Sequence, residues 1–343
     1  MDIFNIYLPI AQQNFNLLLL VTIGFCVGVL GGFFGVGGAW IVTPALNIFG
    51  FPMPYAIGTD FAHIFGKSIV STKKHNKMGN VDWKLGFFTM IGTIPGVEVG
   101  AQVIMFLERI GLVESIVRWV YIFMLIGLGI FMIYDYAVIR KKREEAAKEG
   151  IVSNKKSLVE KIRDIKIPPM VNFPRSNIAS ISIWTIVFVF FLAGFISGFL
   201  GVGGGFIRMP TLIYMFGLPT AVAVGTDLFI VMLDGAYGCF TYSLKGRTDL
   251  IAAILMLVGA AIGAQIGVTA VKYIRGYGIR LLFALMILFA GISVILKQVQ
   301  VQFNIPELKL ASGIVIMGSA TLMCVIITIK LISAAYKEKK MHS

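Results

Sequence analysis

Two glycine-rich stretches are the part of this sequence best suited to bind a small anion. They read GGFFGVGG from Gly31 to Gly38 and GFLGVGGG from Gly198 to Gly205. Consecutive glycines adopt positive φ freely, so their backbone amides can curl into a concave nest that holds an anion. A helix that begins directly after each nest would add partial positive charge. The glycines expected to line this site are Gly35, Gly37, Gly38, Gly201, Gly203 and Gly204.

Close helix packing is the alternative role for glycines in a bilayer, and we expect it for Gly24, Gly28, Gly127 and Gly129. A nucleotide site is not indicated, because neither glycine stretch completes the GxGxxG pattern.

Arg208 lies just after the second glycine stretch and is the only charged residue between Asn177 and Thr226. An arginine in the middle of a bilayer costs roughly 2.5–3.5 kcal/mol on insertion scales, so it needs a partner or a wet cavity. Its planar fork of donors suits an anion with several oxygens. Arg208 is therefore a candidate substrate ligand. The alternative is a structural ion pair with Asp227 or Asp234.

Asp60, His63 and Lys67 are spaced to lie on one face of a helix, and Asp227 and Asp234 repeat the outer spacing in the second half. Polar residues on one stripe of a membrane helix usually face the bundle interior. Carboxylates beside a histidine could bind a coupling proton. Lys67 could attract the substrate. The alternative is an internal Asp60–Lys67 salt bridge that only orients helices.

The composition places these residues in a membrane protein. Hydrophobic residues make up 57% of the 343 residues and charged residues only 14%, against about 25% charged in soluble domains. So few charges cannot cover a soluble surface. The net charge of +13 does not indicate nucleic-acid binding, because Lys and Arg gather between apolar runs instead of forming a basic face with aromatics.

Apolar runs long enough to cross a bilayer need about 20 helical residues. Seven are clear: Tyr55–Thr72, Trp83–Leu107, Val113–Ile139, Ala221–Leu244, Asp249–Val271, Ile279–Leu296 and Leu308–Tyr336. Two more, Leu17–Phe49 and Ile178–Phe216, are too long for one crossing, and each is broken near its middle by a glycine stretch. We expect each of these two to form a V-shaped pair of helices.

The two halves of the chain are copies of one unit. The Gly-Val-Gly-Gly loop, a proline, a Phe-Gly pair, a Gly-Thr-Asp motif and three spaced glycines follow in the same order in both. Matching positions are 166 residues apart up to the proline and 167 afterwards, so one insertion keeps the register. Asp82 and Asp249 match in this alignment and are expected to cap helices.

The positions of basic residues predict how the two copies insert. The segment 139–176 holds sixteen charges, eleven of them basic, and the C-terminal tail is also basic, so both are expected in the cytoplasm. Counting spans from there places the two copies in opposite orientations. Lys245 and Arg247 then fall outside, against the rule. Inverted repeats with broken helices are typical of secondary transporters, whose substrate site lies near the midplane.

The expected fold is an all-α polytopic membrane protein of two inverted repeats, each with a broken helix pair and three further helices, plus one additional C-terminal helix. The predicted divisions are 1–16 (N-terminal segment), 17–139 (first repeat), 140–176 (charged linker), 177–296 (second repeat) and 297–343 (final helix and basic tail).

The order of these motifs resembles the TauE/SafE family of sulfite and organosulfonate exporters, from about Leu17 to Leu296. The resemblance implies a secondary transporter that moves small sulfur-containing anions, usually outward. It places Thr59 and Thr226, together with Pro44 and Pro210, among the motif positions. The two threonines thereby join the predicted substrate site.

We therefore expect export of a sulfite- or organosulfonate-class oxyanion by alternating access, driven by an ion gradient or the membrane potential, since no ATP-binding motif is present. The expected location is the cell membrane, with the linker and C-terminus cytoplasmic; the expected partners are the anion, the bilayer and a coupling proton or ion. No metal, cofactor or nucleic acid is expected.

Two other functions are left open by the sequence. A passive anion channel would use the same pore without coupling. An intramembrane enzyme would use Asp60 and Asp227 as base and acid. The usual GxGD setting of such aspartates is absent, since both sites read Gly-Thr-Asp, so an enzyme is not expected.

Overall fold

Each half of the chain begins with a short hairpin and continues with a helix that a glycine loop interrupts. The computed structural model describes residues 4–139, 158–201, 203–274 and 277–341. The first half comprises β1 (Asn5–Leu8), β2 (Gln13–Asn16), α1 (Leu17–Phe34), α2 (Ala39–Phe49), α3 (Met53–Lys77), α4 (Trp83–Arg109), α5 (Val113–Tyr134) and a π-helical turn, Asp135–Ile139.

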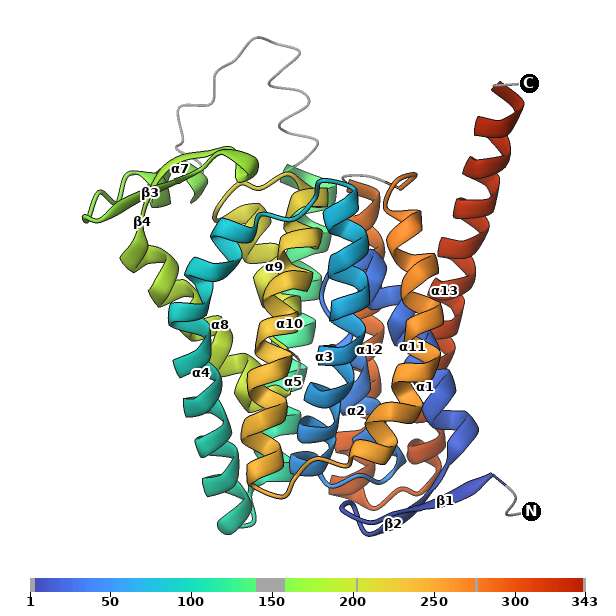
Figure 1. Cartoon of the computed structure of the whole chain (residues 1–343). Coiled ribbons are helices and arrows are strands. Elements are labelled where there is room, and N and C mark those ends of the chain that lie inside the picture. Colours follow the sequence, from blue (N-terminus) through green and yellow to red (C-terminus); the bar gives the residue numbers. More distant parts are fainter. Residues whose placement is uncertain (1–3, 140–157, 202, 275–276, 342–343) are drawn as a thin grey trace.

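The second half repeats this order and ends with one more helix (Figure 1). It comprises α7 (Leu158–Arg163), β3 (Met170–Phe173), a 3-10 turn (Pro174–Ser176), β4 (Ile178–Ser182), α8 (Ile183–Leu200), α9 (Gly205–Tyr214), α10 (Thr220–Leu244), α11 (Leu250–Ala270), α12 (Tyr277–Phe303) and α13 (Glu307–Met341). Both hairpins are antiparallel. They belong to the repeated unit, although the sequence analysis did not predict them. Much of the predicted linker lies outside the described residues.

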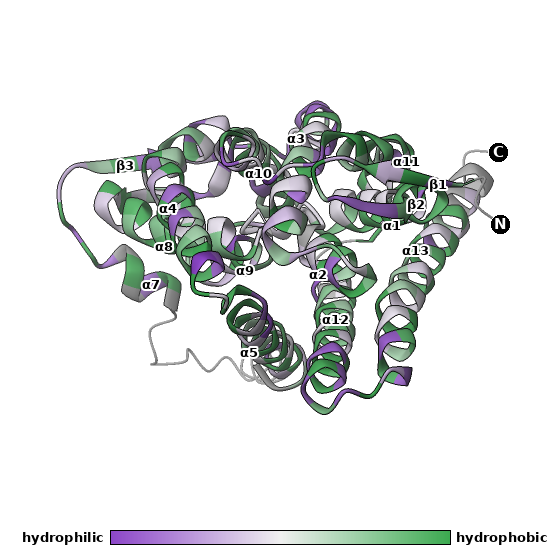
Figure 2. Cartoon of the chain, turned by 90° about the horizontal axis from the view of Figure 1, so that it is seen from below, coloured by the Kyte–Doolittle hydropathy of each residue, from purple (hydrophilic) through white to green (hydrophobic). Residues whose placement is uncertain are grey.

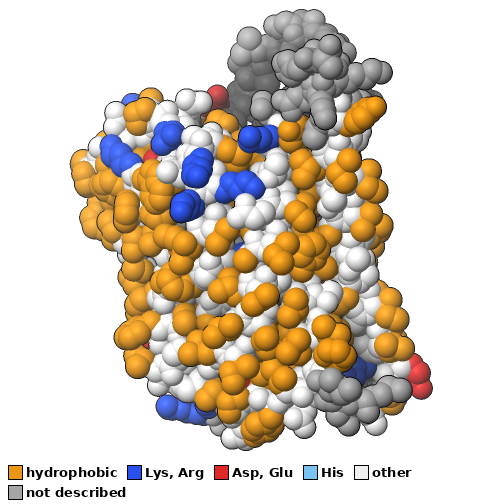
Figure 3. Space-filling view, turned by 45° about the vertical axis from the view of Figure 1, so that its right-hand side comes forward, with side chains coloured by type: hydrophobic (Ala, Val, Ile, Leu, Met, Phe, Trp, Pro, Cys, Tyr) orange, Lys and Arg blue, Asp and Glu red, His pale blue; other side chains and the backbone are white. Residues whose placement is uncertain are grey.

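The helices are those of a polytopic membrane protein, as predicted. Eight helices in the described parts of the chain are long and apolar enough to cross a membrane: α1, α4, α5, α8, α10, α11, α12 and α13. Hydrophobic side chains spread over the face drawn in Figure 3, and most of its Lys and Arg side chains gather in the upper part. The prediction of a clear apolar span at Tyr55–Thr72 is wrong in one respect: α3, which contains it, is not among the eight, because it carries a stripe of polar and charged residues that are buried inside the bundle.

Glycines let the two halves pack backbone against backbone. A Cβ atom at Gly24 of α1 would collide with the Met256 carbonyl of α11, and one at Gly28 would lie 2.5 Å from the Ala260 carbonyl oxygen. These contacts advance together along both chains, so α1 and α11 run parallel. Gly194 and Gly198 of α8 meet the backbone of α4 in the same way. The packing role predicted for Gly24 and Gly28 is confirmed. For Gly127 it is wrong, since none of the described residues lies within 4 Å of its Cβ position.

This backbone contact predicts a strong effect of side-chain size at one face. Gly263→Leu places a side chain where the Phe25 carbonyl lies, so α1 and α11 must separate and we expect little folded protein. Gly127→Leu adds the same side chain in open space and should behave like the wild type. Yield of monodisperse protein after detergent extraction measures both. Equal yields would show that the α1–α11 contact is not required for folding.

α3 and α10 cross the centre of the bundle in opposite directions. Gly238 of α10 packs on Phe61 of α3, and Gly235 packs on Phe65, so residue numbers rise along one helix as they fall along the other. Figure 1 shows that equivalent helices of the two halves run in opposite directions. Seen from below in Figure 2, α2 and α9 lie between the row that contains α3 and α10 and the pair α5 and α12.

The predicted caps tie each half to a hairpin. The side chains of Asp82 and Asp249 accept hydrogen bonds from backbone N–H groups in the first turns of α4 and α11, which confirms the prediction. The second carboxylate oxygen of Asp249 accepts from the N–H groups of Ile10 and Ala11 in the first hairpin, at 3.2 and 3.3 Å. The second carboxylate oxygen of Asp82 accepts a hydrogen bond from the Ser176 hydroxyl, next to the second hairpin, at 2.6 Å.

The two basic residues that break the charge rule are paired with acids of the other half. Arg247 donates to Glu108 at 2.9 Å, and Lys245 lies 3.5 Å from Glu98. Their charges are therefore partly neutralised at the lower edge of the bundle, which weakens them as a signal for the cytoplasmic side.

Candidate functional site

The two glycine loops are sharp reversals that only glycine adopts without strain. α1 ends at Gly35 and α2 begins after Gly38, with φ values of 81° at both glycines. Gly201 and Gly204 take φ values of 73° and 63° at the same points of α8 and α9. Each short helix therefore starts at a loop inside the bundle, with its partially positive N-terminus directed to the centre.

The loops of the two halves lie together. A Cβ atom at Gly205, at the start of α9, would be 2.6 Å from the Val36 carbonyl oxygen of the first loop. Gly37 and Gly203 both lie against Val231 of α10. The structure thus brings the two interruptions to one place. Some loop N–H groups are already used, because Gly35, Gly38 and Gly201 donate to backbone carbonyls.

Arg208 is held by acids of its own half. Its Nε donates to Asp227 at 2.9 Å, and its two terminal nitrogens donate to Asp234 and to the Gly203 carbonyl. All three side chains are buried. Between the two alternatives left open by the sequence, the geometry favours the structural ion pair. The guanidinium stabilises the second loop, and each of its three nitrogens already donates one hydrogen bond.

The matching cluster in the first half is only partly paired. Asp60 accepts a hydrogen bond from the Thr43 hydroxyl at 2.9 Å and lies 3.4 Å from His63 Nδ1. The Nε2 atom of His63 has no hydrogen-bond partner among the described residues. The expected Asp60–Lys67 salt bridge is not formed, because neither oxygen of Asp60 is within ion-pair distance of Lys67 in the described structure.

The side chain of Lys67 is fully buried, and its amino group has no hydrogen-bond partner in the part of the chain that the structure describes. Its Nζ lies against the first glycine loop, where a Cβ atom at Gly38 would be 3.1 Å away and one at Gly31 closer still. A buried charge without a partner is costly to fold. Such a group marks a place where a ligand or water supplies the missing contacts.

Comparison with known proteins agrees with this arrangement. Residues 20–294 match the sulfite exporter TauE/SafE family. The chain belongs to this family. A probable membrane transporter protein of Bacillus subtilis, YunE, is 26% identical over 288 residues, which are 82% of this chain and 97% of that protein. A probable membrane transporter protein of Methanocaldococcus jannaschii is 24% identical over 296 residues, 81% of this chain and 95% of that protein. No solved structure matches significantly.

In this TauE/SafE protein the two threonines of the Gly-Thr-Asp motifs join the halves together. The Thr59 hydroxyl accepts a hydrogen bond from the Asp249 N–H at 3.0 Å, and the Thr226 hydroxyl accepts from the Asp82 N–H at 2.9 Å. Each threonine thus supports the capped start of a helix in the opposite half. This contact gives the motif a structural role in both copies.

A substitution at Thr59 separates these roles. Thr59→Val keeps the shape but leaves the buried Asp249 N–H without an acceptor, so we expect a loss of about 1–3 kcal/mol of stability. The substrate KM should stay at the wild-type value. Thermal unfolding in detergent and flux in liposomes measure the two effects, with the exposed Thr22→Val as control. A raised KM at unchanged stability would return Thr59 to the substrate site.

Several polar residues of this region were not predicted. The side chains of Ser68, Ser71, Thr72 and His75 are buried and each has a polar atom without a partner among the described residues. They continue from Lys67 along α3 toward its upper end. The sequence did hold a signal, because Lys67, Ser71 and His75 are four residues apart and therefore share a helix face.

Proposed function

We propose that this TauE/SafE membrane transporter exports a small sulfur-containing oxyanion, of the sulfite or organosulfonate class, by alternating access at a site between the two glycine loops. The observation that carries the proposal is the buried, unpartnered ammonium of Lys67 beside the first loop. A bound oxyanion would supply both the countercharge and the hydrogen-bond acceptors that this group lacks. The family match supports the substrate class.

In this proposal the two halves have different tasks. The Lys67 ammonium and the unpaired Nε2 of His63 hold the anion, next to the N-terminal end of α2. Asp60, which contacts His63 and Thr43, is the proposed proton-coupling group. Asp227 and Asp234 are held by Arg208, so they keep the second loop in place and take no part in coupling.

The unpaired polar atoms along α3 support a hydrated route from Lys67 to the upper edge of the bundle. Buried hydroxyls without partners are normally satisfied by water. On the other side of Lys67, Gly235 and Gly238 of α10 pack closely on the backbone of Phe65 and on the ring of Phe61. If the basic linker and tail lie in the cytoplasm, this route faces the cytoplasm and admits the anion from that side.

Membrane potential alone favours such export. An anion that leaves a negative-inside cell gains roughly 2.3 kcal/mol per charge at 100 mV. The proposed location is accordingly the cell membrane, with the two copies of the unit inserted in opposite orientations.

Flux measurements in liposomes test the proposal. Purified protein is reconstituted, and efflux of sulfite, sulfate, thiosulfate and a sulfonate is followed with and without a pH gradient. A coupled exporter shows saturable flux of a sulfur oxyanion that responds to the gradient. Flux that neither saturates nor responds would make the protein a passive anion channel, and no flux of any of these anions would refute the substrate class.

A further inference from the structure

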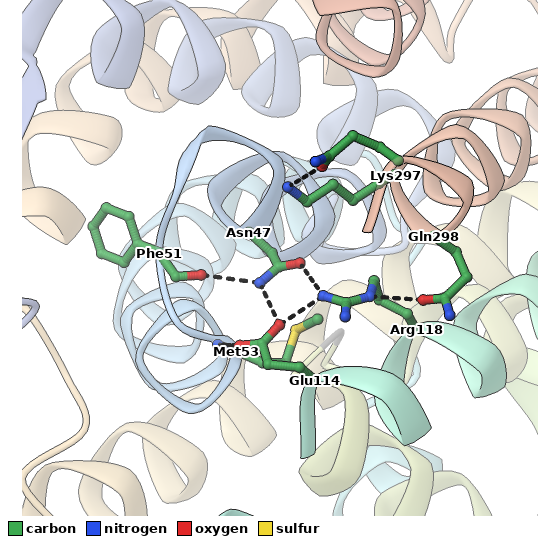
Figure 4. A network of polar contacts seen from close by, with 8 residues as sticks. Asn47, Phe51, Met53, Glu114, Arg118, Lys297 and Gln298 are labelled. Carbon is green, nitrogen blue, oxygen red and sulfur yellow. Dashed lines mark hydrogen bonds and ion pairs between the residues drawn. The ribbon is translucent and has the colours of Figure 1, made fainter. Parts of the chain in front are cut away.

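A second group of cations lies away from the glycine loops, at the other end of α2 (Figure 4). Arg118 comes from α5 and Lys297 from α12, and both reach the end of α2 at Asn47. Arg118 is only 6% exposed. We propose that Arg118 and Lys297 form a second anion site, which binds the transported oxyanion between the central site and the lower edge of the bundle. This inference rests on the proposed function.

The charges of this group do not balance. Glu114 is the one acid among its members, and it accepts from Arg118 at 2.8 Å, from Asn47 at 3.0 Å and from the Met53 N–H at 2.7 Å. Lys297 donates to the neutral amide of Gln300 at 3.0 Å and has no ion pair in the described structure. One cation at the end of α2 would satisfy the helix dipole. The second cation is a surplus that an anion would neutralise.

A small cavity lies beside this group. Its lining includes Arg118 and Lys297 together with Pro44 and Tyr121. Pro44 follows Thr43, the hydrogen-bond donor to Asp60. The Tyr121 hydroxyl donates to the Leu200 carbonyl at 2.6 Å, directly before the second glycine loop. The two anion sites are therefore neighbours, separated by the body of α2 and the Tyr121 ring.

The cavity is closed in the described conformation. Its volume of about 10 Å³ holds roughly one water, so an oxyanion enters only after the end of α2 moves or Lys297 turns. Lys297 is half-buried and held by a single hydrogen bond, so its movement costs little. The Asn47–Glu114–Arg118 contacts tie the end of α2 to α5 in this closed form.

The matching end of α9 holds a different polar group, in which the Arg280 guanidinium lies 5.3 Å from the Tyr214 ring centroid and the Tyr214 hydroxyl donates to Asp135 at 2.8 Å. Beside Pro210, the residue that matches Pro44, the groove between α5 and α9 is lined by apolar and aromatic side chains such as Phe123, Phe131 and Ile207. Its lining contains no charged residue.

Binding and flux measurements with Lys297→Gln test the site. Calorimetric titration of the purified wild type with sulfite should show two classes of binding. Lys297→Gln should lose the weaker, salt-sensitive class and raise the KM for sulfite presented at the α2-end face by about tenfold at low ionic strength. Exposed Lys330→Gln is the matched control and should change neither. Thermal unfolding of each variant shows whether it is folded, and Lys297 is chosen because its removal leaves no acid unpaired.

The outcomes separate this inference from the proposed function. If the wild type transports sulfite and Lys297→Gln keeps both its binding stoichiometry and its KM, the second site does not exist although the transporter does. If the wild type binds and transports no sulfur oxyanion, both proposals are wrong. The second-site proposal would also be overturned if Lys297→Gln lost one binding class but kept the same KM as Lys330→Gln. The anion at that site would then bind off the transport route.

Discussion

Lys67→Met abolishes saturable oxyanion transport and at the same time stabilises the protein. We expect kcat/KM to fall by about 100-fold, because the variant loses the charged donor that meets the substrate at the first glycine loop. The free energy of unfolding should rise, because the empty site no longer holds a buried ammonium without a partner. Liposome flux measures the first effect, and thermal unfolding in detergent measures the second.

The opposite signs of these two effects distinguish a functional cation from a structural one. If Lys67 had a structural role, its substitution would lower the stability of the protein, as the loss of one partner of a buried ion pair does. Lys330→Met removes an exposed lysine of α13 and serves as the control, with no change expected in either quantity. A Lys67→Met variant that transports at the wild-type KM, or that unfolds at a lower temperature, would contradict the assignment.

Arg208→Met, in contrast to Lys67→Met, should lower the stability of the protein and yield little folded material. The substitution leaves the buried carboxylates of Asp227 and Asp234 without their cation. Removing one partner of a buried ion pair costs about 3–5 kcal/mol, and here two buried acids lose their partner. The yield of monodisperse protein and its thermal midpoint after extraction measure the loss.

The triple variant Arg208→Met, Asp227→Asn, Asp234→Asn tests the cause. It removes all three charges together, so most of the lost stability should return. Arg247→Met is the matched control, because that arginine pairs with Glu108 at a partly exposed position and should cost about 0–1 kcal/mol. A folded Arg208→Met protein with unchanged stability and a raised KM would place Arg208 in the substrate site instead.

The contrast between Lys67 and Arg208 suggests how one duplicated unit serves two purposes. Lys67 occupies the position that matches Asp234, so the same place in the fold holds a cation in one half and an acid in the other. Arg208 is held in the second half by ion pairs with two acids. The amino group of Lys67 in the first half has no such partner among the described residues. A fixed second loop and a ligand-dependent first loop follow from that difference.

Much of the architecture was predictable from local patterns. Apolar runs, the repeated glycine loops and the helix caps at Asp82 and Asp249 are properties of neighbouring residues, and they appear where the sequence predicts them, except that α3 is too polar to count as the apolar span predicted at Tyr55–Thr72. The hairpins were missed because their strands are four or five residues long and apolar residues do not alternate clearly in them. Gly127 was misjudged because a glycine looks the same in sequence whether it faces a helix or open space.

The candidate site was predictable as a set of residues but not as a set of contacts. The sequence by itself determined that Asp60, His63 and Lys67 share a helix face, since that depends only on the helical repeat. Only the tertiary structure decided that Arg208 is neutralised, that Lys67 is not, and that Thr59 supports the opposite half. Which charges meet depends on distances between helices that are far apart in the chain, and periodicity carries no information about those distances.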